Sequence, residues 1–187
     1  MKKFVSVILA LAMTLTLAAC GASNAEPTTE TTVPPTTEAA AVLEGTLEEL
    51  LNQVITEEPV EFMGGVIPVD LTDTSEDGLW AIKYNTGLDS ADQISEAAVY
   101  EPMMGSIAYS MVMVRVNAGE DALAVAEAMK AGIDTRKWIC VEANDLLVAG
   151  YGDVVMLIMV DNANGMTAQS FVDAFQKVAG AELDFVI

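Results

Sequence analysis

The chain has 187 residues, of which 28 are acidic, 8 are basic and none is histidine, so its formal net charge is −20 at pH 7. Such a negative surface repels phosphate, which argues against nucleic-acid partners and favours cationic ones: a basic peptide, a polyamine, a basic protein face or a divalent metal. The lack of histidine excludes Ser-His-Asp and Cys-His catalysis and nearly all catalytic zinc sites. The plainer interpretation of the charge is a solvated acidic face that keeps the protein soluble.

Residues 1–20 have the pattern of a secretory signal: a basic start, an apolar run over Phe4–Leu17, and then Leu17-Ala18-Ala19-Cys20. The last four residues resemble the lipobox of bacterial lipoproteins. This resemblance implies a signal peptide over residues 1–19, cleavage before Cys20, and a diacylglyceryl group on the Cys20 sulfur. The apolar run is shorter than the about 20 residues that a membrane span needs. At least two acyl chains, palmitate among them, make a durable anchor, so we expect a cell-membrane protein that faces outside the cytoplasm.

Residues 20–43 contain the lipidated cysteine and a segment rich in Thr and Pro. With almost nothing apolar to bury, this segment is expected to be a disordered and partly extended tether. In polyproline form it reaches about 60 to 70 Å from the membrane. A plain spacer is the first interpretation, and O-glycosylation of its threonines is the alternative. Residues 44–187 are long enough for a single globular domain without disulfides.

The domain is predicted to open with a helix, because Thr46 and Glu49 have the spacing of a capping box. Apolar residues follow at helical spacing and the helix is expected to end near Pro59. Alternation over Leu79–Asn85 predicts a strand, and Ser90 with Gln93 predicts the start of a short helix through Ala98.

A second strand is predicted over Ile107–Val116, followed by a helix from Gly119 to about Arg136. Leu146–Ala149 and Val154–Val160 flank a turn and predict a hairpin. Thr167 is expected to cap a last helix that Gly180 ends. The predicted class is α+β: a mostly antiparallel sheet of about four strands with helices packed on one face, in part ferredoxin-like (β-α-β-β-α).

Three stretches carry a family resemblance: residues 97–104, residues 107–121 with their strand and Glu120-Asp121 helix start, and Gly152-Asp153 with the apolar run to Leu157. Together they resemble an uncharacterised domain family of small lipoproteins from Gram-positive, often spore-forming, bacteria. The similarity covers about residues 70 to 180. It implies the same envelope localisation and a compact α+β domain, and it implies no activity, cofactor or site residue.

One acidic turn is a candidate cation site. Asp73, Ser75 and Asp77 precede Gly78 with the spacing that begins a calcium loop. The twelfth position, where a bidentate Glu is expected, is Tyr84, so an ordinary acidic turn is the competing interpretation. The segment Asp161–Gly165 is a weaker candidate, because Ala163 stands where a ligand is expected.

The methionines raise the question of copper(I), which thioethers bind. Most of them lie in predicted strands, where core packing is the simpler interpretation. Glu101, Pro102, Met103 and Met104 differ, because they lie in a predicted loop and are the candidate contact surface. Cys140 lies among apolar neighbours and is predicted to be a buried small side chain rather than a reactive thiol.

No nucleotide-binding, nucleophile or metal-cluster motif stands out. We therefore predict a non-enzymatic, membrane-anchored lipoprotein without cofactor that binds an envelope protein or peptide. The alternative is an accessory lipoprotein that binds a cation or cationic ligand through acidic residues 70–77. A carboxylate-dependent hydrolase is the third hypothesis. The partner's identity and the oligomeric state do not follow from the sequence.

Overall fold

The computed structural model describes residues 42–187. The predicted signal peptide (1–19), the lipidation site Cys20 and the tether up to residue 41 lie outside the described residues. The elements are, in chain order, α1 (Leu47–Glu57), β1 (Gly64–Pro68), α2 (Glu76–Thr86), β2 (Ile94–Pro102), β3 (Tyr109–Val116), α3 (Ala122–Gly132), β4 (Asp145–Tyr151), β5 (Val154–Val160), the 3₁₀ turn η1 (Asn162–Asn164), α4 (Ala168–Ala179) and β6 (Phe185–Val186). No helix among residues 42–187 has the length and apolar character to cross a membrane.

The described strands form one antiparallel sheet in the order β1-β2-β3-β5-β4-β6. The α+β class and the antiparallel sheet are confirmed. The expected number of about four strands is wrong, because the sheet has six. Two of the six are short edge strands that carry little sequence signal: β1 reads Gly-Gly-Val-Ile-Pro and β6 has two residues.

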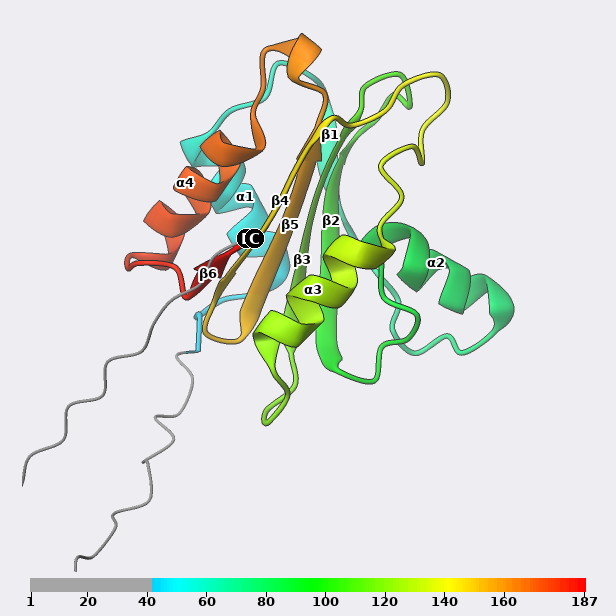
Figure 1. The fold of residues 1–187 in the computed structure, drawn as a ribbon, viewed down its shortest axis with the longest axis vertical. Helices are drawn as coiled ribbons and strands as arrows, with labels where there is room; N and C mark the ends of the chain where they lie inside the picture. Colours follow the sequence, from blue (N-terminus) through cyan, green and yellow to red (C-terminus); the bar gives the residue numbers. More distant parts are fainter. Residues whose placement is uncertain (1–41) are drawn as a thin grey trace, which may run out of the picture. The chain divides into compact units, whose positions relative to one another are not determined.

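The helices cover both faces of the sheet, so the prediction of helices on one face is wrong. Helices α1 and α4 lie on one side, and α2 and α3 lie on the other (Figure 1). The central strands explain this arrangement. In β3, Met111 and Met113 point to the first face while Val112 and Val114 point to the second, and all four are fully buried. A strand that is apolar on both faces needs cover on both.

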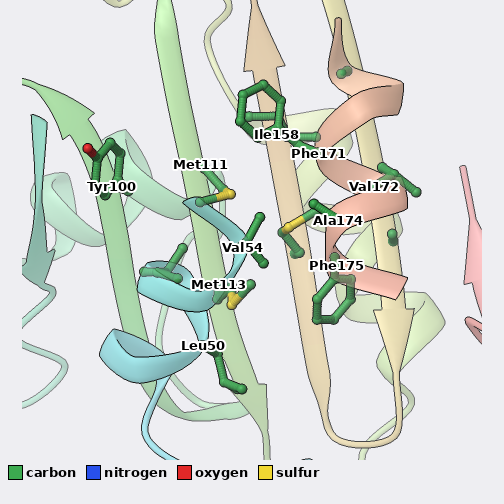
Figure 2. Close-up of a cluster of buried hydrophobic side chains, with 14 of the residues drawn as sticks. Leu50, Val54, Tyr100, Met111, Met113, Ile158, Phe171, Val172, Ala174 and Phe175 are labelled. Atoms are coloured by element: carbon green, nitrogen blue, oxygen red, sulfur yellow. The ribbon is translucent and has the colours of Figure 1, made fainter. Parts of the chain in front are cut away.

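The first core lies between the sheet and helices α1 and α4. In this core, Leu50 and Val54 of α1 and Phe171 and Phe175 of α4 are buried together with Met111 and Met113 of β3 (Figure 2). The capping box predicted for α1 is confirmed, since the Glu49 N–H donates to Thr46 Oγ1 and the Thr46 N–H donates to the Glu49 carboxylate. The predicted caps of α4, Thr167 and Gly180, are confirmed as well.

Two predicted elements have the opposite type. Leu79–Asn85, predicted as a strand, lies in helix α2, which Ser75 caps by accepting the Gly78 N–H. Ile82 and Thr86 are four residues apart and form its buried face. The short helix predicted from Ser90 through Ala98 is mostly strand β2. Its Ala and Glu residues favour a helix locally, but pairing with β1 on one side and β3 on the other determines its conformation.

The β-α-β-β-α order from β3 to α4 is present, with β5 lying between β3 and β4. The predicted order of elements is therefore present, whereas the ferredoxin-like arrangement of the helices is not. The two helices differ from the prediction, because α3 packs in the second core and α4 in the first. The predicted hairpin between β4 and β5 is also present.

Arg115, near the end of β3, ties the first described residues to the sheet. Its guanidinium donates to Asp153 Oδ2 at 2.6 Å, to the Leu43 carbonyl at 3.1 Å and to the Gly45 carbonyl at 2.6 Å. Asp153 Oδ1 accepts the Leu43 N–H at 3.0 Å. The chain is therefore attached to the domain from Leu43 onward.

Candidate functional site

An exposed methionine surface lies where β1 and β2 meet. Met63, just before β1, pairs with Met103, just after β2, through the Met103 N–H and the Met63 carbonyl at 2.9 Å. Met63, Met103 and Met104 are 80%, 75% and 63% exposed. Ile67, farther along β1, is 55% exposed. We call Met63, Ile67, Met103 and Met104 the methionine surface.

Register explains why three of these side chains lie on one side of the sheet. Met63 lies opposite Met103, and Gly65 and Ile67 of β1 lie opposite Glu101 and Val99 of β2. Alternate residues of a strand point to the same face, so Met63, Ile67 and Met103 share the face that carries the second core. Helix α1 packs against the other face of β1, where Val66 joins the first core.

The four residues predicted as a contact surface divide between two environments. Met103 and Met104 are exposed, as a contact role requires. Pro102 is the last residue of β2. Glu101 points inward and binds Lys137. The sequence does not single out Met63 and Ile67, because their proximity to Met103 depends on the pairing of β1 with β2.

Lys137 is the centre of a buried polar cluster. Its Nζ lies 2.6 Å from Glu101 Oε1 and 3.1 Å from Ser110 Oγ, and the Ser110 hydroxyl donates to Glu101 Oε1 at 3.0 Å. The side chain of Lys137 is only 1% exposed and that of Glu101 is 18% exposed. Burial lowers the pKa of the Lys137 ammonium, and the Glu101 carboxylate opposes this shift. The Tyr84 ring lies 4.7 Å from the ammonium.

This cluster has the residue types of a Ser-Lys nucleophile but not its accessibility. Ser110 is fully buried in β3. Its hydroxyl donates to the Glu101 carboxylate and accepts from Lys137 Nζ. A nucleophile needs an exposed oxygen beside a neutral base. The geometry instead fastens the segment that carries Lys137 to strands β2 and β3. Nothing in the sequence marked Lys137, since its partners lie 36 and 27 residues away.

The candidate calcium residues form the cap of helix α2. The Ser75 N–H donates to Asp73 Oδ1 at 2.9 Å, and Ser75 Oγ accepts the Gly78 N–H at 3.2 Å. Gly78 is required here, because the Asp73 carbonyl oxygen lies too close to leave room for a Cβ. Asp77 is exposed in the first helical turn. Within residues 42–187, no group of three or more Cys, Asp or Glu side chains is arranged to hold a metal ion.

A shallow groove of about 420 Å³ lies beside the start of β2, and Glu48, Asp70 and Glu96 are among the residues that line it. Glu96 also accepts the Leu47 N–H and faces Arg115 at 3.3 Å. Asp70 accepts both the N–H and the hydroxyl of Thr72, and the side-chain bond is the main cause of its lowered pKa.

The prediction for Cys140 is wrong, because its side chain is exposed and its backbone is left-handed, with φ at 64°. Trp138, two residues earlier, packs against the second core instead. The prediction for the strand methionines is confirmed. Met111, Met113, Met156 and Met159 are fully buried in the two cores.

No family model, curated protein or solved structure matches the chain.

Proposed function

We propose that this protein is a membrane-anchored extracytoplasmic lipoprotein whose domain binds a partner protein or peptide without catalysing a reaction. The observation that carries the proposal is the methionine surface, in which three exposed methionines adjoin the end of a β-strand pair. Exposed apolar side chains that gather at one place mark interaction sites. Methionine suits such surfaces because its flexible thioether adapts to different partners.

The anchoring part of the proposal is supported by residues 1–20. The basic start, the apolar run and Leu17-Ala18-Ala19-Cys20 together resemble a lipoprotein signal. The resemblance to small Gram-positive lipoproteins supports the same localisation. The non-enzymatic part is supported by Ser110, the residue most like a nucleophile in its surroundings, which has no exposed surface.

The test is photo-crosslinking in intact Gram-positive cells that produce the full chain. A photoreactive amino acid is placed at Met103 in one strain and at Met104 in another, with exposed Ala128 of α3 as the matched control. The proposal expects the same adduct from positions 103 and 104 and none from position 128. Equal adducts from all three positions, or none at 103 and 104, contradict it. A parallel Cys20→Ala variant is expected to be absent from the membrane fraction.

A cation-binding accessory lipoprotein is the second candidate. The groove bordered by Glu48, Asp70 and Glu96 favours it, because it adjoins the acidic segment 70–77. A thermal melt with divalent metals and polyamines separates this candidate from the first, because a specifically bound cation raises the melting temperature.

A further inference from the structure

Strand β1 presents a free backbone edge. Two hydrogen bonds fix its orientation: the Met103 N–H donates to the Met63 carbonyl, and the Val69 N–H donates to the Ala97 carbonyl, both at 2.9 Å. In an antiparallel pair, alternate residues direct their N–H and C=O groups toward the partner strand. Residues 63, 65, 67 and 69 therefore bond β2, whereas Gly64 and Val66 direct their groups outward. No described strand pairs with this outer side.

Space beside this edge is open on the face of the methionine surface. A Cβ added to Gly65 would meet nothing within 4 Å. Met63 and Ile67, on either side of Gly65, are more than half exposed. An added strand would therefore find the N–H donors of Gly64 and Val66, the carbonyl acceptors of Gly64, Val66 and Pro68, and apolar side chains of β1 next to its own.

The charge around the edge selects among the possible occupants. The sequence has no Lys or Arg between Lys3 and Lys83. Acidic residues flank β1 on both sides: Glu57, Glu58 and Glu61 before it, and Asp70, Asp73, Glu76 and Asp77 after it. Within the described residues only Glu57 of this set has a cationic partner, an exposed Lys177 at 3.7 Å.

A second copy of this chain is a poor occupant. Pairing of two β1 edges would bring the acidic flanks of both copies together, and like charges across strands are destabilising. Charged flanks and a proline such as Pro68 are devices that oppose edge-to-edge association. A segment of opposite charge avoids the charge repulsion, and at this edge it lacks only the N–H donor that Pro68 cannot supply.

We infer that β1 binds an extended, basic segment of the partner protein, which adds to the sheet as a further strand. Strand addition draws its affinity from main-chain hydrogen bonds and its specificity from alternate side chains. Here one set of side chains would contact Met63 and Ile67, and lysines or arginines would face the acidic flanks. This inference rests on the proposed function and specifies the partner's chemistry and the mode of binding.

The test uses the full chain, purified in a nonionic detergent, and a seven-residue peptide of alternating Lys and Val with a fluorescent label. Two matched peptides replace Lys by Glu, or carry N-methyl groups on alternate amides. Binding is measured by anisotropy at low and high salt. Hydrogen exchange at the Gly64 and Val66 amides reports directly on the edge.

Two variants of the protein separate backbone from side-chain effects. Val66→Pro removes an outward N–H, which an edge strand tolerates, while Val66→Ala loses most of the same side chain and retains the donor. We expect the Lys-Val peptide to bind and to slow hydrogen exchange at the Gly64 and Val66 amides by about tenfold. We expect its binding to weaken at high salt. It expects Val66→Pro to bind about five to tenfold more weakly than Val66→Ala.

Several results overturn the inference: no binding of the Lys-Val peptide, equal binding of the Glu or N-methylated peptide, or binding with unchanged exchange at Gly64 and Val66. If Val66→Pro fails to fold, the exchange measurement on the unaltered chain still decides. Failure here leaves the proposed function standing, because the adducts at Met103 and Met104 test that function separately. Conversely, if Met103 and Met104 give no adducts but the peptide slows exchange at Gly64 and Val66, only the role of the methionine surface is contradicted.

Discussion

Removing Glu101 is expected to destabilise the protein more than removing Lys137. Glu101→Gln leaves the Lys137 ammonium, which is 1% exposed, without an anion. Breaking a buried pair in this way costs about 3 kcal/mol of unfolding free energy. Lys137→Met leaves Glu101 unpaired, but its side chain is 18% exposed and still accepts from Ser110, so we expect about 2 kcal/mol. At about 3 °C per kcal/mol for a domain of this size, the two melting temperatures fall by about 9 and 6 °C.

The double variant gives the sharper result. Glu101→Gln with Lys137→Met leaves no buried charge, so its loss is expected to be about 2 to 3 kcal/mol, well short of the sum. Urea denaturation followed by circular dichroism measures all three free energies. Lys130→Met, on the exposed side of α3, is the control and should stay within about 0.5 kcal/mol. Additive losses for Glu101 and Lys137, within about 0.5 kcal/mol, would refute the desolvated pair.

Three further outcomes are expected. Burial raises the pKa of Tyr109 well above 10 in the folded protein. The contribution of the neutral Tyr109 side chain to stability is therefore present below pH 10 and is lost as the pH rises further. Tyr109→Phe should raise the pH at which alkaline unfolding occurs, as measured by circular dichroism. Arg115→Met should cost about 2 to 4 kcal/mol in urea denaturation, because it leaves the Asp153 carboxylate, with a side chain 19% exposed, unpaired; a loss no larger than that of Lys130→Met would be inconsistent with this ion pair. Millimolar calcium or polyamine should shift the melting temperature no more than simple salt if segment 70–77 is a helix cap, whereas a saturable rise that Asp73→Asn abolishes would establish the cation-binding alternative.

The parts of the fold that the sequence predicts well are those with strong local chemistry. The capping box of Thr46 and Glu49 and the Thr167 cap place helices α1 and α4 correctly, because these side chains bond their own backbone. Strand β2 escaped prediction because Ala97 and Ala98 favour a helix until neighbouring strands pair with them on both sides.

The candidate site shows the same limit. Met103 and Met104 are recognisable from the sequence, since a Pro and a Gly flank them in a segment that leaves the strand. Met63 is not recognisable, because it joins them through a cross-strand contact over 40 residues. The Glu101 side chain turns inward because its partner, Lys137, comes from a segment that no local pattern connects to β2.

The bond from Arg115 to Leu43 fixes the point at which the preceding chain joins the domain. Leu43 is held near Val116, at the end of β3, whereas Met103 and Met104 follow the opposite end of the β2–β3 pair. The eight residues of β3 separate these ends by about 25 Å. A chain anchored through Cys20 would thus enter the domain at one end and present its methionines at the other. With the proposed anchor, a deletion within residues 21–41 would bring the methionine surface closer to the membrane and leave the surface itself unchanged.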